Sequence, residues 1–341
     1  MSPDGKTVYR VSVLISTKNR FQDLKECIDS ILAQTVKPDE IILVDASDTC
    51  ESLEMVKKAL AATGIKLTYH RQDVVAGKIR KTAAWNKAVR LALGDVIIFL
   101  DDDVVLDKYY IYHILQPYYE NPENIAGVTG YMKKPNDEKT AQKRDSFLCF
   151  LNRLFCSLFL LPHEEGNGRM QSSGFPAYPD SKVGIVSVEV MPTCNMSIKK
   201  EVFREFTFDE WFYGYSYQED DDFTYRVSKK YKFLYTPFAE LVHKRSPAAR
   251  GNLDAVETMK IVNHYYFFKK NMSKSCKNCM AFVWAEFGVL FLRCFSFSSI
   301  KDLLQSFTGL TAWRNIPLIK ARMSGYYKIL QSLILKQEIE N

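Results

Sequence analysis

Acidic side chains gather at three places in the sequence where they could do chemistry. These are Asp45, the triplet Asp101–Asp103 and the run 219–222. Because three adjacent carboxylates repel one another, a divalent cation bound through their oxygens is the usual relief. Mg²⁺ and Mn²⁺ prefer such ligands and share their remaining positions with phosphate groups. The triplet therefore predicts a metal site that also binds a diphosphate, and acids that only decorate a turn are the alternative.

The acidic run 219–222 begins a predicted helix, Glu219–Lys230. The helix dipole favours acids in the first turn, and that effect alone could explain Asp221 and Asp222. It does not explain why a second acidic cluster stands in a part of the chain with no net charge. A carboxylate that accepts a proton from a substrate hydroxyl is what general-base catalysis requires. We therefore take this run as the candidate position of a catalytic base.

The elements that must position these acids alternate regularly along the first hundred residues. Apolar runs typical of buried strands are separated by helical periodicity, in the order 11–16, 21–32, 41–45, 51–62, 65–70, 81–93 and 96–100. Strands that are apolar throughout and alternate with amphipathic helices predict a mostly parallel sheet covered on both faces. Ligands of such sheets bind at the carboxyl ends of the strands. Asp45 and Asp101–Asp103 are predicted to lie there.

The distribution of charge divides the chain. Residues 251–341 hold 12 of the 46 Lys and Arg and 6 of the 40 Asp and Glu, so they carry the whole net charge of +6. We expect an α/β domain over 1–250, with a variable acceptor-side insertion at 132–182, and a helical, basic and aromatic region over 251–341. A neutral main domain argues against a nucleic-acid-binding protein.

Two common nucleotide-binding motifs are missing from the sequence. A phosphate-binding loop requires Lys followed by Ser or Thr, but Gly77-Lys78 is followed by Ile79, which argues against a kinase or NTPase. No Gly-x-Gly-x-x-Gly follows the first strand, which argues against a dehydrogenase.

Several ordered segments resemble the nucleotide-sugar glycosyltransferases of family 2, which have the GT-A fold. The segments are Val11–Arg20, Val44–Ser47, Lys81–Asn86, Gly94–Asp103, Thr193–Ser197, Phe208–Glu210 and Glu219–Arg226. The resemblance covers about the first 240 residues. It implies an α/β fold with a Rossmann-like, mostly parallel sheet flanked by helices, to which the helical C-terminal region is added.

The resemblance also implies roles for individual residues. The implied catalytic base is Asp220, with Glu219 beside it. The implied nucleotide and donor contacts are Thr17, Asn19, Arg20, Asp45, Lys81, Asp101, Asp102 and Asn195. The implied ligands of Mn²⁺ or Mg²⁺ are Asp101, Asp103 and His243, which follows a predicted turn at Pro237–Ala239. A structural, hydrogen-bonded role is the alternative for His243.

The activity implied by the resemblance is an inverting transfer of a hexose from a nucleotide-diphosphate sugar, with UDP as the first candidate nucleotide. The implied acceptor is a hydroxyl of a glycan or of a lipid-linked molecule, as in polysaccharide biosynthesis. A non-catalytic nucleotide-sugar-binding protein and a nucleotidyltransferase on a similar fold are the alternatives.

The C-terminal region requires a separate interpretation. Residues 279–300 are apolar apart from Glu286, Arg293 and a few serines. Each of these two charges would cost roughly 2.5–3.5 kcal/mol in the middle of a membrane, so an in-plane or buried helix is favoured. Four aromatic residues are followed directly by two lysines at 265–270, and such a mixture is typical of helices that lie on a membrane. We expect peripheral attachment to the inner face of a membrane, and the alternative is a helical cover or a dimer contact.

The start of the sequence, 1–10, has no apolar core of the kind found in secretory signals. The eight cysteines are irregularly spaced, which fits reduced thiols better than a disulfide framework. Both features predict a cytoplasmic location.

Overall fold

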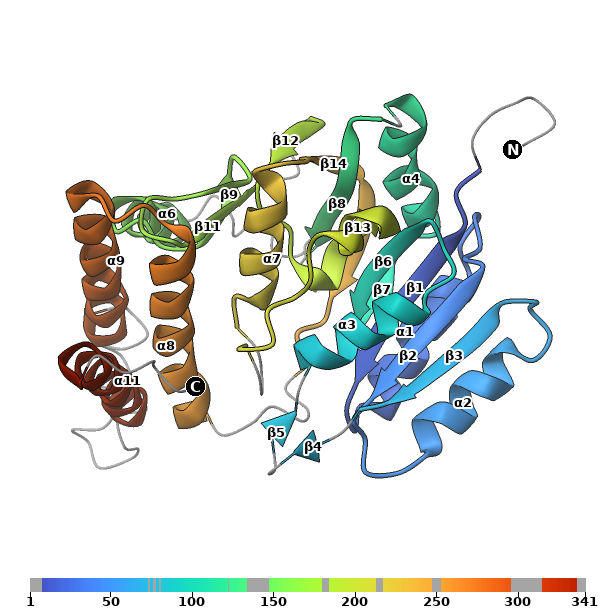
Figure 1. Ribbon diagram of the computed structural model, residues 1–341, viewed down its shortest axis with the longest axis horizontal. Coiled ribbons are helices and arrows are strands. Elements are labelled where there is room, and N and C mark those ends of the chain that lie inside the picture. Colours follow the sequence, from blue (N-terminus) through green and yellow to red (C-terminus); the bar gives the residue numbers. More distant parts are fainter. Residues whose placement is uncertain are drawn as a thin grey trace. The chain divides into compact units, whose positions relative to one another are not determined.

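The computed structural model of the chain describes residues 8–72, 74–75, 78–79, 81–121, 123–133, 147–179, 184–212, 217–246, 253–295 and 315–335. These residues form two compact units (Figure 1). The first falls within residues 1–140, 165–169 and 178–249, and the second within 141–164, 170–177 and 250–341. Much of the predicted insertion 132–182 is thus grouped with the C-terminal helices, whereas its residues 134–146 and 180–182 lie outside the described part.

The first unit is built on a nine-stranded mixed sheet with the strand order β12-β14-β8-β13-β6-β1-β2-β3, and β7 pairs with β14. Its strands are β1 (Val11–Thr17), β2 (Glu40–Asp45), β3 (Lys66–Arg71), β6 (Val96–Asp101), β7 (Val104–Leu106), β8 (Ile125–Lys133), β12 (Val186–Val188), β13 (Met196–Lys199) and β14 (Lys232–His243). The predicted parallel arrangement is found in the half formed by β3, β2, β1 and β6.

Helices cover both faces of this sheet. They are α1 (Phe21–Leu32), α2 (Glu51–Leu60), α3 (Lys81–Leu91), α4 (Tyr110–Glu120) and α7 (Glu219–Ser228), with short 3₁₀ turns η1 (Thr193–Asn195) and η2 (Lys200–Arg204). Side chains alternate between the faces along a strand. Val13 and Ile15 of β1 join the core beneath α1 and α4, whereas Leu14 joins the core beneath α3 and α7. The α/β fold with a doubly covered sheet is therefore confirmed.

Strand register brings the predicted chemical residues to one edge of the sheet. Thr17 at the end of β1 pairs with Asp45 at the end of β2, and Ser16 pairs with Asp101 at the end of β6. On the other side of β6, Met196 of β13 pairs with Phe99, so η1 also lies at this edge. The parallel alignment of β1, β2 and β6 thus produces the site predicted at their carboxyl ends.

The predicted turn at Pro237–Ala239 is wrong. These residues lie inside β14, where its register with β8 shifts between Tyr235 and Glu240. Proline is tolerated in a sheet at such an irregularity because no ladder hydrogen bond is needed from it there. Opposite it stands Gly130, whose missing Cβ would lie 2.1 Å from the carbonyl oxygen of Ala239. The bulge and the glycine let one long strand pass the sheet and end at His243.

Other elements complete the chain. Short strands outside the main sheet are β4 (Val74–Val75), β5 (Lys78–Ile79), β9 (His163–Gly166), β10 (Arg169–Met170) and β11 (Pro176–Pro179). The second unit contains the helices α6 (Phe147–Leu158), α8 (Leu253–Asn271), α9 (Cys276–Phe295) and α11 (Asn315–Leu335), which confirms the predicted C-terminal helices. Within the described ranges, none of the helices has the length and apolar character needed to cross a membrane.

A buried network of charges holds the helices of the second unit together. Glu286 of α9 accepts hydrogen bonds from Arg322 (2.6 Å) and Tyr326 (2.7 Å) of α11 and lies 2.6 Å from His264 Nδ1 of α8. His264 Nε2 is 2.9 Å from the carbonyl oxygen of Ser173, so both ring nitrogens face acceptors. Burial alone would raise the pKa of Glu286, but His264 and Arg322 outweigh it and lower the pKa to about 2.

Replacing Glu286 by glutamine is expected to lower the free energy of unfolding by roughly 3 kcal/mol, because it removes the carboxylate that contacts both Arg322 and His264 and leaves Arg322 with the more distant carboxylate of Glu257 at 3.5 Å. The folded-state pKa lies below the unfolded value. Glu286 therefore stabilises the fold above about pH 4.5, and that contribution is lost as pH falls toward 2. Urea unfolding at pH 7 and pH 3 checks both statements. Equal stability of the two proteins at pH 7 would contradict the role of the network.

Candidate active site

The last strand residues of β1 and the loop after it are fixed by the aspartate triplet. Thr17 Oγ1 donates a 2.8 Å hydrogen bond to Asp102 Oδ2, and Arg20 Nη1 lies 3.0 Å from Asp102 Oδ1 and 3.5 Å from Asp103 Oδ2. Burial, together with the charge of Asp101, raises the pKa of Asp102 to about 6 although Arg20 and Thr17 oppose the shift. Both oxygens of Asp102 are thus used inside the protein, where they orient Thr17 and Arg20.

A group of three possible metal ligands forms where β6, β7 and β14 meet. Asp101, Asp103 and His243 each offer an atom, and these atoms lie within 4.8 Å of one another. His243 reaches this place because it pairs with Val104 at the end of β14. In the part of the chain that the structure describes, this is the one such group.

The chemistry of Asp103 fits a divalent cation. Its Oδ2 accepts a 2.8 Å hydrogen bond from the Ser246 amide, whereas its buried Oδ1 has no hydrogen-bond partner and lies 3.1 Å from His243 Nε2. Burial alone would raise the pKa of Asp103, but His243, the Ser246 amide and Arg20 outweigh it and lower the pKa. An ionised carboxylate with an orphaned oxygen beside a second carboxylate and an imidazole is a donor set suited to Mn²⁺ or Mg²⁺.

Lys81 connects this cluster with the start of α7. Its Nζ lies 3.8 Å from Asp101 Oδ1 and 3.7 Å from Glu219 Oε1, and it stands 4.3 Å from the centre of the Trp85 ring. Burial alone would lower the pKa of Lys81, but Asp101, Glu219 and Asp220 outweigh it and raise the pKa. The two acidic clusters noted in the sequence are therefore parts of one site, joined by a permanently charged lysine.

The residue directly before α7, Gln218, has an unusual backbone conformation. Gln218 is buried and has φ +68°, a left-handed conformation that side chains other than glycine rarely adopt. Strained backbone of this kind clusters at functional sites because the surrounding structure must hold it in place. It leads directly into Glu219 and Asp220.

The four acids of α7 have different environments. Asp222 pairs with Arg226 at 2.8 Å, and Asp221 accepts a 2.9 Å hydrogen bond from Tyr178, so both have structural partners. Burial and the charge of Asp220 raise the pKa of Glu219 to about 8. Asp220 is half-buried, and its Oδ2 accepts a 3.2 Å bond from the Thr193 amide. Burial also raises the pKa of Asp220, although backbone donors and Lys81 oppose the shift.

Asp45 and Asn19 form the opposite side of the edge. Asp45 is fully buried, accepts a 2.7 Å hydrogen bond from the Ser47 amide and lies 3.4 Å from the Tyr69 hydroxyl. Asn19 has φ +52° and exchanges two hydrogen bonds with Asp48. Asp45 thus shapes the loop after β2, and that loop is bound through Asp48 to the loop after β1.

The structure places Asn195 in the core and separates its side chain from the acidic clusters. Its amide nitrogen donates to the Gly130 carbonyl (2.7 Å), and its Oδ1 accepts from the Tyr110 hydroxyl (2.7 Å). The residue is 1% exposed. Asn195 therefore fastens η1 to β8 and α4, which fixes the Thr193 amide that contacts Asp220.

Sequence reasoning gave no role to the residues that hold α3 against the segment 208–212. Asn86 exchanges hydrogen bonds with the backbone of Phe208 (both 2.9 Å), and Thr82 donates to the Phe212 carbonyl at 2.8 Å. Ser246 and Tyr178 were missed as well. The segments Lys81–Asn86 and Phe208–Glu210 were part of the family resemblance, but their contact with each other was not predicted, and nothing in the sequence marks Ser246 or Tyr178.

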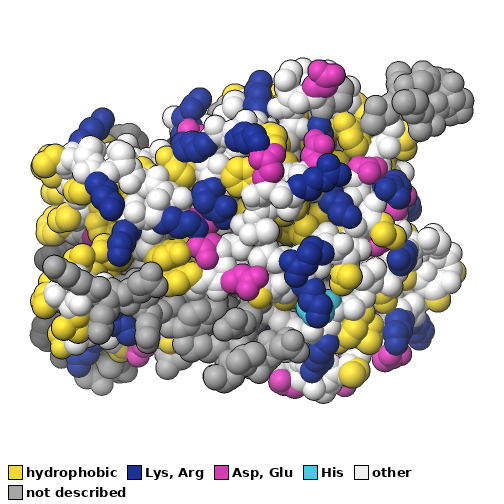
Figure 2. Space-filling model, in the orientation of Figure 1, with side chains coloured by type: hydrophobic (Ala, Val, Ile, Leu, Met, Phe, Trp, Pro, Cys, Tyr) yellow, Lys and Arg dark blue, Asp and Glu magenta, His cyan; other side chains and the backbone are white. Residues whose placement is uncertain are grey.

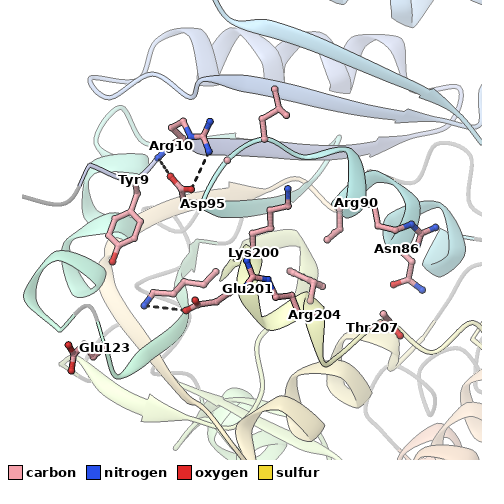
Figure 3. A pocket seen from close by; sticks show the side chains of 15 residues that line it. Tyr9, Arg10, Asn86, Arg90, Asp95, Glu123, Lys200, Glu201, Arg204 and Thr207 are labelled. Carbon is pink, nitrogen blue, oxygen red and sulfur yellow. Dashed lines mark hydrogen bonds and ion pairs between the residues drawn. The ribbon is translucent and has the colours of Figure 1, made fainter. Parts of the chain in front are cut away.

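A cavity of about 970 Å³ lies elsewhere in the described structure (Figure 3). Its walls include Arg10 and Gly94, which come shortly before the first residues of β1 and β6. They also include Lys199, the last residue of β13, which pairs with Val96 at the start of β6. It is therefore on the opposite edge from the aspartate triplet. The acidic site is identified by the chemistry of its residues and not by this cavity, whose walls include none of Asp101, Asp103, Asp220 and His243.

Comparison with known proteins agrees with this geometry. The sequence model of the family described as Glycosyl transferase family 2 matches residues 12–179. A glucosyl-dolichyl phosphate glucuronosyltransferase of Haloferax volcanii is 28% identical over 34% of this chain and 36% of its own length. A PGL/p-HBAD biosynthesis glycosyltransferase of Mycobacterium bovis is 36% identical over 27% of this chain and 34% of its own. The matches thus span about a third of these curated relatives.

A solved structure shares the fold. A mannosyltransferase from Pyrobaculum calidifontis, in complex with GDP-Man and Mn²⁺, aligns over 97% of this chain and 89% of its own with a TM-score of 0.53 and 16% identity. Residues 12–179 therefore form a glycosyl transferase family 2 domain, and the fold is GT-A-like.

Proposed function

We propose that the chain transfers a hexose from a nucleotide-diphosphate sugar to a hydroxyl group, with inversion at the anomeric carbon. The observation that carries the proposal is the single site in which Lys81 connects the possible metal ligands to the acids that begin α7. The acceptor oxygen forms a bond to the anomeric carbon as the bond from that carbon to the diphosphate breaks. The acceptor proton goes to a carboxylate, and the nucleoside diphosphate leaves.

Asp220 is the proposed base. It is half-buried, and each of its oxygens accepts a single amide bond, from Asp221 and from Thr193, so each retains a lone pair for a proton. Burial and the charge of Asp220 raise the pKa of Glu219, and its Oε1 lies 3.7 Å from Lys81 Nζ, so we assign Glu219 to hold Lys81 beside Asp220.

Asp101, Asp103 and His243 are the proposed ligands of Mn²⁺ or Mg²⁺. When bound, the cation supplies positive charge that stabilises the departing diphosphate. Lys81 and Arg20 add fixed positive charge at the same edge of the sheet. The Mn²⁺ bound by the related mannosyltransferase is consistent with this proposal.

The remaining assignments are also proposals. UDP-linked sugars are the first donors to test, and GDP-linked sugars the second because the related structure binds GDP-Man. We propose a glycan or lipid-linked acceptor, a catalytic domain over 1–250 with an acceptor-side insertion at 132–182, and a separate region over 251–341. The proposed location is cytoplasmic, on the inner face of a membrane.

The stereochemistry of the reaction tests the proposed function. Nucleotide sugars are first screened by thermal shift with Mn²⁺, and the donor that stabilises the protein is then incubated with an alcohol acceptor or water. We expect an α-linked donor to give a β product, measured by proton NMR within the first turnovers before mutarotation. An α product would contradict single displacement, and the absence of donor binding across the panel would contradict a nucleotide-sugar site.

A further inference from the structure

Helix α9 of the second unit has an apolar outer face. Met280, Val283, Trp284 and Phe287 follow the spacing i, i+3, i+4 and i+7, so they lie on one side of the helix. Their exposed fractions are 67%, 66%, 43% and 51%. Scattered exposed apolar residues are ordinary, but four on one helical stripe form a patch.

The inner face of the same helix explains why these residues point outward. Ala281 and Ala285 are buried, and Gly288 lies so near Phe159 that an added Cβ would be 2.4 Å from it. Glu286 is engaged with His264 and Arg322. Since the inner face is committed to close packing and to buried charge, the helix cannot rotate to bury its large apolar side chains. Helix α9 thus keeps Glu286 buried while its large apolar side chains Met280, Val283 and Phe287 are exposed.

The patch extends onto α6. Leu154 and Leu158 are about half exposed, and Trp284 Nε1 donates a 2.8 Å hydrogen bond to the Leu158 carbonyl. The Trp284 ring lies 5.0 Å from Phe159. We name these residues the α9 face: Leu154, Leu158, Met280, Val283, Trp284 and Phe287. Hydrophobic side chains gather over α9 at the left edge of Figure 2.

The charge around the α9 face is of one sign. From Thr258 to Ala285 the sequence contains five lysines and no acid. Of these, Lys274 and Lys277 are exposed directly before and within the first turn of α9. A second copy of this chain is a poor partner, because residues 258–285 of that copy would offer these lysines no acid to pair with. An anionic surface with an apolar interior meets both requirements.

We propose that the α9 face binds the surface of an anionic lipid membrane, with α9 lying in the plane of the interface. Its apolar stripe enters the boundary between headgroups and acyl chains, Trp284 sits at that boundary, and Lys274 and Lys277 contact anionic headgroups. This binding is independent of the reaction. Its consequence, that the acceptor hydroxyl belongs to a lipid-linked molecule, rests on the proposed function.

Flotation of the full chain with vesicles tests the proposal. We expect binding to vesicles of phosphatidylcholine with phosphatidylglycerol and little binding to phosphatidylcholine alone. Changing Met280→Gln with Val283→Gln should weaken partitioning at least about tenfold, because both apolar groups leave the acyl boundary. Changing Lys274→Gln with Lys277→Gln should weaken it by roughly 30-fold at low salt and much less at high salt.

The matched control is Leu91→Gln with Leu93→Gln, which removes two exposed apolar residues from the first unit. It should leave flotation unchanged. Equal flotation of the wild type and the Met280/Val283 variant would overturn the proposal. It would also be overturned if the wild type did not bind vesicles but formed a dimer that the Met280/Val283 substitutions convert to a monomer. Nucleotide-sugar calorimetry on the same variants distinguishes this proposal from the proposed function. A variant that loses flotation but keeps its affinity for the donor has lost membrane binding alone.

Discussion

Replacing Asp220 by asparagine should lower the turnover number by about 10²–10⁴-fold, the usual contribution of a general base. Asparagine keeps the size of the side chain, and its single oxygen can still accept the bond from the Thr193 amide, whereas the bond from the Asp221 amide is lost. It cannot take the proton of an acceptor hydroxyl. Donor affinity, measured by calorimetry, should remain within about twofold of the wild type, because the lost proton acceptor stabilises the transition state and not the bound donor.

The matched control for this prediction is Asp221→Asn. Asp221 is the next acid of the same helix, but Tyr178 occupies its carboxylate. Its replacement should reduce turnover far less than the change at Asp220, and circular dichroism should show both variants folded. Unchanged turnover in the Asp220 variant would remove it as the base, and an equal loss in the two variants would indicate a structural effect of charge in α7.

Replacing Asp103 by alanine should reduce the affinity for Mn²⁺ by at least about 100-fold, since even the residues that orient metal ligands often contribute 10–100-fold. The variant loses the orphaned Oδ1 that faces His243. Because the cation and the diphosphate are proposed to bind together, nucleotide affinity in Mn²⁺ should fall to the value that the wild type shows in EDTA.

The affinity for Mn²⁺ can be measured without turnover, from the loss of the free-ion electron paramagnetic resonance signal on titration. Asp29→Ala is the matched control, because Asp29 is a helix carboxylate paired with Lys25 away from the triplet. It should bind Mn²⁺ as the wild type does. If the Asp103 variant does so too, Asp101, Asp103 and His243 are not the ligands.

The parallel half of the sheet and the edge that carries the acids were predictable. Buried strands such as Ile41–Asp45 are apolar throughout and are bounded by amphipathic helices, so local pattern and topology agree. Parallel strands align their carboxyl ends, and that places Asp45 and Asp101 together without knowledge of side-chain contacts. The prediction succeeded because it depended on periodicity and on a rule of sheet geometry.

The antiparallel half was harder because its signals are not local. Pro237 in β14 suggested a turn, whereas the strand tolerates it at a bulge that Gly130 of a distant strand accommodates. The role of Lys81 as a bridge also depends on two partners, Asp101 and Glu219, far apart in the sequence. Such pairings are set by tertiary packing, which a single sequence does not display.

The family resemblance located the segments that form the site, but it did not show which way each side chain points. Asp102 and Asn195 lie near the predicted edge, but their side chains are buried and bound to protein groups. In the structure Asp102 orients Arg20 and Asn195 holds η1, and their predicted contacts with the donor stay predictions. A motif indicates which segment forms a site, and the direction of each side chain depends on its partners.

The central claim is that the edge formed by Asp101, Asp103 and His243 holds a divalent cation against the diphosphate of a nucleotide. Electron–nuclear double resonance of Mn²⁺ bound to the protein, with UDP and with GDP, tests it most directly. We expect a ³¹P coupling typical of direct Mn²⁺–phosphate coordination with at least one nucleotide, and its disappearance in the Asp103→Ala variant. A bound Mn²⁺ without ³¹P coupling, or a coupling that survives the substitution, would contradict this assignment of the metal site.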